Sequence, residues 1–161
     1  MSDLTVTIRE SIILPNGNPQ VSENIKTISG VNQIARRIDT VTTSFEGTGI
    51  ELIRFVDSES KQTAGSFVKD TVKYIRITNL DTDNFCDLYL IDSEESFTKF
   101  KLDPGKTIMF SNEDFVASSN GDYVAADYVD SAYYTSFKNL DIIKAKADTA
   151  NINLEYLIAS S

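Results

Sequence analysis

The clearest pattern along the chain is the alternation of apolar and polar residues in short runs. In residues 72–78, Ile75 and Ile77 fall on one face, and Tyr74 and Arg76 fall on the other. A period of two residues is typical of a β-strand with one face toward a core. Similar runs, rich in Val, Ile, Thr, Phe and Tyr, recur between turn-forming Gly, Pro, Asn and Asp residues. The pattern predicts an all-β fold, an antiparallel β-sandwich or jelly roll with at most one short helix.

Two turns are marked by their own residues. The segment 15–19 contains an Asn-Gly pair, which tolerates positive φ and predicts a loop after the first strand. Asp103-Pro104-Gly105 predicts a tight turn, because Pro fixes φ and Gly supplies the positive φ that follows. We expect this turn to join its flanking strands as a hairpin. The expected strands are 4–14, 50–56, 72–78, 85–91, 97–102, 107–110, 142–147 and 152–158.

Residues 21–43 fit two interpretations. The apolar positions from Ile25 to Ile38 are three and four residues apart, which favours a short helix. Ser29-Gly30 weakens that interpretation. The alternative is a strand from residue 34 to residue 43, with Ile34, Arg36 and Ile38 on one face.

The run 85–91 is apolar on both faces, which predicts a central strand covered on both sides. Cys86 lies in this run, so we interpret it as a small, inert core residue. The apolar faces of the alternating strands should meet in one core. Its expected members are Ile75, Ile77, Leu88, Leu90, Leu102 and Leu154.

Length and charge narrow the range of functions. The 161 residues suit one domain, residues 1–161, and a hydrophobic share of 41% is enough for a core. A net charge of -9 disfavours both nucleic acid and an anionic membrane surface as partners. No apolar run approaches the roughly 18 residues needed to span a bilayer.

The residue types that carry most catalysis are scarce. The chain has no His and no Trp, and Cys86 is its only cysteine. Triads, paired-cysteine zinc sites and phosphate-binding loops are therefore missing from the sequence. The loop 81–87 places Asp and Asn oxygens at alternating positions, as calcium loops do, but it lacks the Gly and distal Glu of an EF-hand. A turn built by Asp and Asn explains it better. We expect no enzyme, no cofactor and no metal.

One polar segment is rich in aromatic residues. Tyr has an apolar body and a polar tip, which suits protein interfaces. The alternative is a loop folded back over its own core. We expect subunit contacts in residues 119–137 and at one or both chain ends. The interface candidates are Tyr123, Tyr128, Tyr133, Tyr134 and Phe137.

The order of segments 72–81, 85–91 and 100–106, followed by the ending 148–160, resembles small, mostly uncharacterised proteins of tailed bacteriophages of marine bacteria. The likeness covers residues 67–161. It implies a non-enzymatic virion component, such as a capsid decoration (cement), neck or tail protein.

On this resemblance, the partners are other virion proteins and further copies of the chain. The N-terminal part lacks the likeness, which leaves room for an anchoring arm at about residues 1–30. The alternative function is a host-facing carbohydrate-binding β-sandwich, which the absence of Trp disfavours.

Overall fold

The computed structural model describes residues 2–43, 49–93, 97–111 and 140–161. Two 3-10 turns, η1 (Glu59–Lys61) and η2 (Lys69–Thr71), accompany the strands. The strands are β1 (Ser2–Ile13), β2 (Pro19–Val31), β3 (Gln33–Val41), β4 (Ile50–Val56), β5 (Ser66–Val68), β6 (Val72–Asn79), β7 (Cys86–Asp92), β8 (Phe97–Leu102), β9 (Thr107–Ser111), β10 (Leu140–Ala147) and β11 (Ile152–Ser160).

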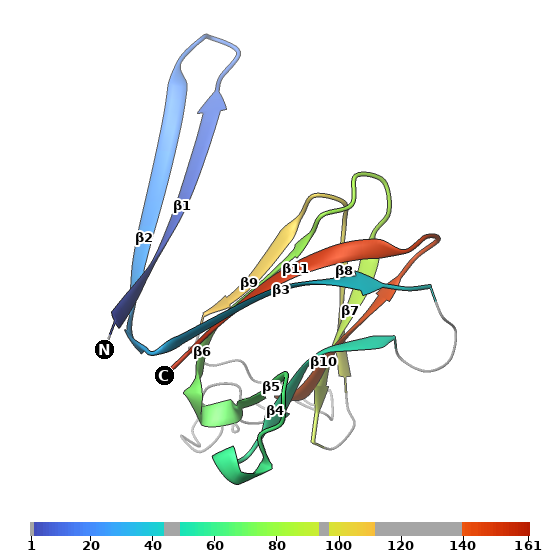
Figure 1. Ribbon diagram of the computed structural model, residues 1–161. Coiled ribbons are helices and arrows are strands. Elements are labelled where there is room, and N and C mark those ends of the chain that lie inside the picture. The colour runs from blue at the N-terminus through green and yellow to red at the C-terminus, as the bar shows by residue number, and fades with distance from the viewer. Residues whose placement is uncertain (1, 44–48, 94–96, 112–139) are drawn as a thin grey trace, which may run out of the picture.

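Two packed sheets form the body of the protein (Figure 1). One has the order β3-β11-β6-β9 and the other the order β5-β4-β10-β7-β8. Only β4 and β5 pair in parallel among the described strands. Several strands that follow one another in sequence lie in opposite sheets, as do β3 and β4, β6 and β7, β8 and β9, and β10 and β11. This crossing gives a jelly-roll-like sandwich and confirms the expected all-β fold.

The core lies between the two sheets. The six residues expected to share it, Ile75, Ile77, Leu88, Leu90, Leu102 and Leu154, are all buried in one cluster. Cys86 lies in the same cluster, so its burial is confirmed.

β7 is a central strand, as expected, because it lies between β10 and β8, but only its inner face is fully buried. Its outer residues Tyr89 and Ile91 are only half-buried. The Tyr89 ring packs edge-on against Phe97, with centroids 5.7 Å apart, and Lys99 Nζ lies 5.9 Å from the Tyr89 centroid. Side chains of the neighbouring β8 therefore cover the apolar outer face only in part, and no third layer lies above it among the described residues.

The turn at Asp103-Pro104-Gly105 is confirmed, but the hairpin is not. Gly105 has a φ of 66°, and Lys106 N donates to Asp103 O at 3.1 Å. However, β8 pairs with β7 and β9 pairs with β6, so the turn carries the chain from one sheet to the other. The turn residues specify the local bend, whereas burial of apolar side chains in the core determines which strands pair.

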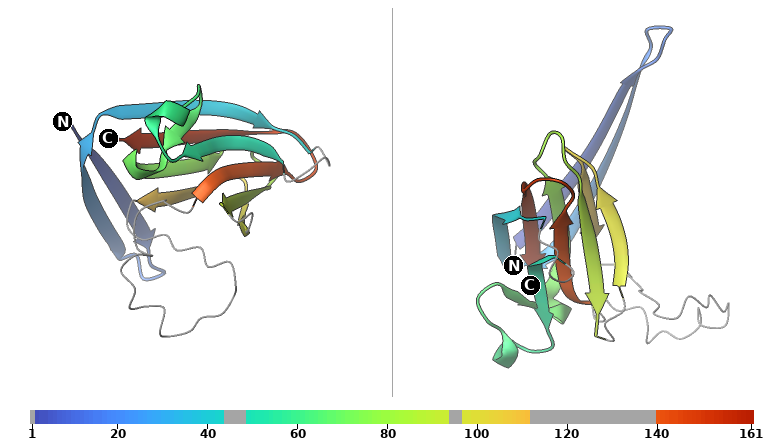
Figure 2. Two further views of the ribbon diagram at one scale, coloured as in Figure 1. Left: turned by 90° about the horizontal axis from the view of Figure 1, so that it is seen from below. Right: turned by 90° about the vertical axis from the view of Figure 1, so that its right-hand side faces the viewer.

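The short helix considered between residues 21 and 37 was wrong, and the alternative strand at residues 34–43 is confirmed as β3. The segment forms β2 and β3, separated only by Asn32. β1 and β2 pair along their length as an isolated hairpin, residues 2–31, which we call the arm. Figure 1 and Figure 2 show the arm projecting from the sandwich. It spans the range for which an anchoring arm was suggested, and its anchoring role stays a prediction.

Candidate interaction surface

The two faces of the arm follow from its register. Leu4, Val6, Ile8, Glu10 and Ile12 share one face, because alternate residues of a strand point the same way. We call this face the inner face. Thr7, Arg9, Ser11 and Ile13 of β1 lie on the opposite face, together with their cross-strand partners Ile25, Glu23, Val21 and Pro19.

The base of the arm is packed on the body. Ile28 and Val31 are buried against Tyr74 of β6 and Ala159 of β11, and Leu4 and Val6 pack on the same cluster. These contacts use the outer face of the four-stranded sheet. Polar contacts reinforce them, because Lys73 Nζ donates to Ser29 O at 2.9 Å and Asn32 N donates to Ser160 O at 2.8 Å.

A bulge shapes this base. The register between β1 and β2 shifts between Ser2 and Leu4, where Gly30 has a φ of 73°. A positive φ is readily adopted by Gly and is typical of a β-bulge that turns a strand. The Ser29-Gly30 pair that weakened the helix interpretation thus lies where the chain leaves the arm for β3.

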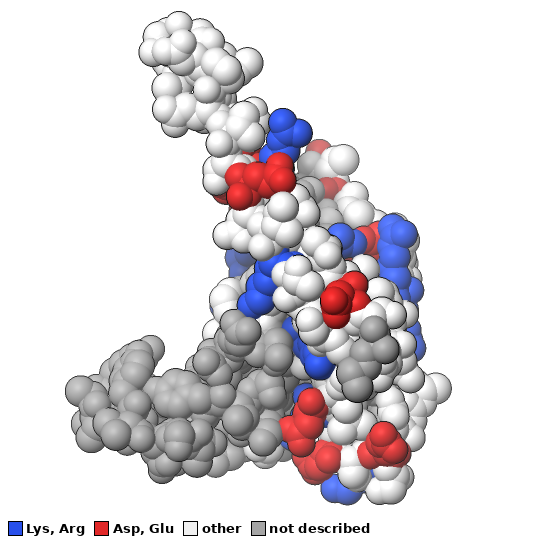
Figure 3. Space-filling model, turned by 90° about the vertical axis from the view of Figure 1, so that its left-hand side faces the viewer, with Lys and Arg blue, Asp and Glu red and all other residues white. Residues whose placement is uncertain are grey.

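The distal part of the arm exposes apolar side chains on both faces. Ile12 is 57% exposed and Ile13 is 73% exposed. Ile8, Val21 and Ile25 are exposed as well. No residue from 11 to 22 is charged, and Figure 3 shows the projecting tip without Lys, Arg, Asp or Glu. Apolar surface on a two-stranded ribbon is typical of a segment that is covered in an assembly.

A second apolar surface lies on β3, at the edge of the four-stranded sheet. Ile34 and Ile38 point outward and are each 57% exposed. Arg36 lies between them, with 65% of its side chain exposed. These are the three residues that the alternative strand at residues 34–43 was expected to carry on one face.

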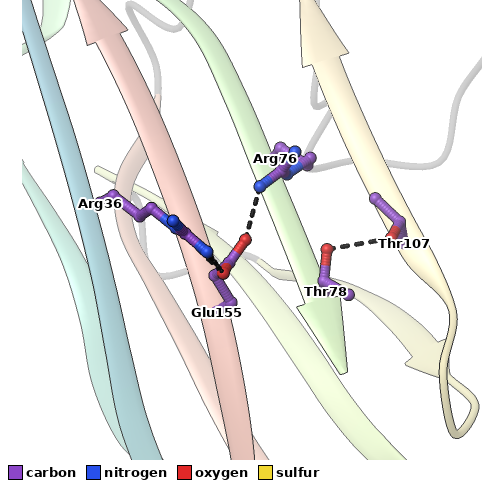
Figure 4. Close-up of polar contacts among 5 residues, drawn as sticks. All are labelled: Arg36, Arg76, Thr78, Thr107 and Glu155. Carbon is purple, nitrogen blue, oxygen red and sulfur yellow. Dashed lines mark hydrogen bonds and ion pairs between the residues drawn. The ribbon is translucent and has the colours of Figure 1, made fainter. Parts of the chain in front are cut away.

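Arg36 belongs to an ion-pair group that crosses three strands (Figure 4). Its Nε donates to Glu155 Oε2 of β11 at 3.0 Å, and its Nη2 pairs with the same oxygen. Arg76 Nη2 of β6 pairs with Glu155 Oε1. Next to it, the hydroxyls of Thr78 and Thr107 are 2.9 Å apart. Two guanidinium groups therefore share one carboxylate on an otherwise acidic protein.

The environment of Glu155 favours its charged form. The hydrogen bond from Arg36 is the main cause that lowers the pKa of the Glu155 carboxyl, and the charge of Arg76 acts in the same direction, against the effect of burial. Its side chain is 10% exposed. Arg76 Nε is the one buried side-chain nitrogen or oxygen in the described ranges that has no hydrogen-bond partner.

The predicted interface residues Tyr123, Tyr128, Tyr133, Tyr134 and Phe137 all lie in 112–139, outside the described residues. Their role as an interface stays a prediction.

Within the segment 81–87, residues 81–84 form the turn that was preferred to a calcium site, and residues 86 and 87 belong to β7. Asp81 Oδ1 accepts hydrogen bonds from Asp83 N at 2.8 Å and from Asn84 N at 2.7 Å. These backbone donors, Asn84 first, lower the pKa of Asp81. Within the described part of the chain, no group of three or more His, Cys, Asp or Glu side chains is placed to hold a metal ion.

Cys86 is fully buried, and burial raises the pKa of its thiol to about 12. Its packing environment therefore disfavours the reactive thiolate.

The sequence predicted a shared face for Ile34, Arg36 and Ile38 and suggested an arm at about residues 1–30, but it identified neither the exposed apolar tip nor the ion-pair group. The uncharged stretch 11–22 is a visible signal for the arm tip, and Glu155 within the apolar run 152–158 is a signal for the ion-pair group. Neither signal identifies which residues lie opposite across the sheet, because that depends on sheet order.

The comparisons with known proteins found no significant match to a protein-family model, a curated protein or a solved structure. Among the helices of the described residues, none has the length and apolar character needed to cross a membrane.

Proposed function

We propose that this chain is a non-enzymatic structural subunit of a bacteriophage virion, either a capsid decoration protein or a neck or tail component. The observation that carries the proposal is the arm, which holds uncharged, apolar side chains away from a well-packed body. Such a segment suits a protein that works by contact with neighbouring subunits. The resemblance of residues 67–161 to phage proteins is the reason for proposing that the assembly is a virion.

Arm and body have separate roles in this proposal. The jelly-roll-like body gives rigidity, and the arm reaches a neighbouring virion protein. Leu14, Asn16 and Gly17 form the turn at its tip, where Gly17 N donates to Leu14 O at 2.8 Å. A tight tip with a narrow ribbon behind it suits insertion between two neighbouring subunits.

The test is incorporation into particles. A tagged chain is supplied to infected host cells, and particles are purified by gradient sedimentation. We expect the parent to co-sediment with particles and the tip variant Ile12→Asp/Ile13→Asp to be lost from them, because burying two carboxylates in an interface is costly. The matched control is Leu80→Asp, which changes an exposed apolar residue on the body.

Two outcomes would oppose the proposal. A parent chain that is absent from particles contradicts the virion assignment. If this parent instead binds glycans on an array in a calcium-dependent manner, the carbohydrate-binding alternative replaces it. Equal loss of the tip variant and the Leu80→Asp control would show that the arm has no special part in assembly.

A further inference from the structure

The inner face of the arm and the outer face of β3 carry matching patterns. On β1, Ile8, Glu10 and Ile12 occupy alternate positions of one face. On β3, Ile34, Arg36 and Ile38 do the same. Each pattern places a charged residue between two exposed isoleucines, and the two charges are opposite.

We propose that the arm of one copy docks on β3 of a second copy, with Glu10 opposite Arg36 and the isoleucines packed on either side. This inference rests on the proposed function, since it names one partner of the arm. Residues two apart on a strand are separated by about 6.6–6.8 Å, so the two patterns have the same spacing. Because each pattern is symmetric about its charge, they match in either strand direction.

The charge of the docking face favours this occupant. Arg36 and Arg76 together face a single carboxylate, Glu155, so the group has a local charge of +1 (two cations and one anion). The whole chain has a net charge of -9, so most of its surface repels another copy. Glu10 therefore meets a site of opposite charge on a second copy, which orients the contact.

The geometry separates the two patterns within one copy. The chain bends at Asn32, and Figure 1 shows the arm and β3 diverging from this bend. The bend is held by the hydrogen bond from Asn32 N to Ser160 O and by the packing of Ile28 and Val31. The arm is thus aimed away from its own β3.

A twofold axis makes the docking reciprocal. Each copy would give its arm to the other, forming two equal contacts in one dimer. Both inner arm faces would then be covered. The opposite face, with Ile13, Val21 and Ile25, would remain available for another virion protein.

Disulfide trapping between two differently sized chains tests the contact. A tagged chain with Glu10→Cys is mixed with an untagged chain with Arg36→Cys and oxidised mildly. The native Cys86 is buried and does not compete. We expect a tagged–untagged disulfide on non-reducing gels. The control is Arg9→Cys, the neighbouring residue on the opposite arm face, which should give little product. Equal yields from the two arm positions, or no mixed disulfide, would overturn the proposal.

Charge exchange provides a second measurement by sedimentation equilibrium. Glu10→Arg and Arg36→Glu should each weaken self-association by about tenfold or more, because each puts like charges together in both contacts. Mixing the two variants should restore the parent affinity, since both contacts of the mixed dimer regain opposite charges. A parent dimer whose affinity neither variant changes would contradict the docking mode. Thermal midpoints identify any variant that fails to fold, and for such a variant the disulfide result decides.

The outcomes separate this inference from the proposed function. If the parent is a monomer at high concentration but still enters particles through its arm tip, self-docking fails and the virion proposal stands. If the parent forms the crosslinked dimer but is absent from particles, self-docking stands and the virion proposal fails.

Discussion

The arm and the sandwich are both built of antiparallel strands, yet they bury their side chains very differently. In β11, Ile152, Leu154, Tyr156 and Ile158 are all at most 1% exposed. In the arm, Ile12 and Ile13 are mostly exposed. Hydrophobic residues in the strands of this protein therefore fall into two groups, those that form the core and those that stay exposed on the arm. In the proposed function, the exposed group is a contact surface for a partner. The difference predicts that stability resides in the body and assembly in the arm.

The largest effect is expected in the core. Leu88→Ala should lower the free energy of unfolding by about 2–5 kcal/mol, because it removes buried methyl groups and leaves a cavity. Leu88 is fully buried between the sheets. The measurement is the denaturant midpoint of the purified chain. A change near zero would show that β7 does not contribute to the core as described.

The Tyr-rich segment 119–137 is the other expected contact region, so its variants test whether assembly depends on the arm alone. Truncation of Tyr128, Tyr133 or Tyr134 to Ala should weaken assembly by about 1–4 kcal/mol for at least one of them, while the fold of the single chain survives. Particle incorporation and the thermal midpoint of each variant provide the check. If all three variants assemble like the parent, the contacts must be sought in the arm instead.

Cys86 tests the packing of the body, and its replacement should leave the arm unchanged. Since burial raises the pKa of its thiol to about 12, a thiol reagent should label the native chain slowly and the unfolded chain rapidly. Cys86→Ser should cost about 1–3 kcal/mol, because it buries a hydroxyl in an apolar site. Assembly should be unchanged. Rapid labelling of native protein would contradict the packing of Cys86.

Glu155→Gln tests the ion-pair group. We expect a loss of about 1–2 kcal/mol at pH 7, a modest value because Arg36 is largely exposed. The pKa of the Glu155 carboxyl is lower in the folded than in the unfolded chain. Its stabilisation is therefore present above the unfolded pKa of about 4.3 and is lost as the pH falls through the folded pKa.

Urea midpoints of the parent and the Glu155→Gln variant should accordingly differ at pH 7 and converge at pH values below the folded pKa of this carboxyl. If the two midpoints differ by the same amount at pH 7 and below the folded pKa, the charge of the carboxylate has no role. The matched control is Asn153→Ala on the same strand. Its urea midpoint should differ from that of the parent by the same amount at both pH values, because Asn153 does not titrate.

The smallest effect on stability is expected in the arm. Ile13→Ser should change the free energy of unfolding of the single chain by less than about 0.5 kcal/mol, because the side chain is exposed. Backbone amides of the distal arm should also exchange hydrogen faster than those of β11. A large loss of stability would show that the arm is covered by its own chain.

The body was more predictable from the sequence than the arm. Where a strand has one buried face, as in residues 72–78 and 152–158, the core requires alternation, and the pattern is clear. Residues 21–31 have little core to face, so their apolar spacing is irregular and does not distinguish a strand from a helix. The sequence did not predict which sheet β9 joins, because the turn at Pro104 fits either a hairpin within one sheet or a connection from one sheet to the other.

The candidate surfaces were predictable only in part. The shared face of Ile34, Arg36 and Ile38 followed from alternation once residues 34–43 were taken as a strand, but alternation did not show that this face points outward. The pairing of Arg36 and Arg76 through Glu155 required the order β3-β11-β6, which joins strands separated by more than seventy residues of sequence.

The position of β11 between β3 and β6 has a consequence for synthesis on the ribosome. Residues 33–41 emerge early, but their only described pairing partner is residues 152–160. Until translation reaches that segment, the edges of β3 and β6 stay unpaired, and such edges are sites of aggregation. The four-stranded sheet therefore closes late, by contacts distant in sequence, which are slow to form. The nascent chain should depend on chaperones that shield unpaired strands during this interval.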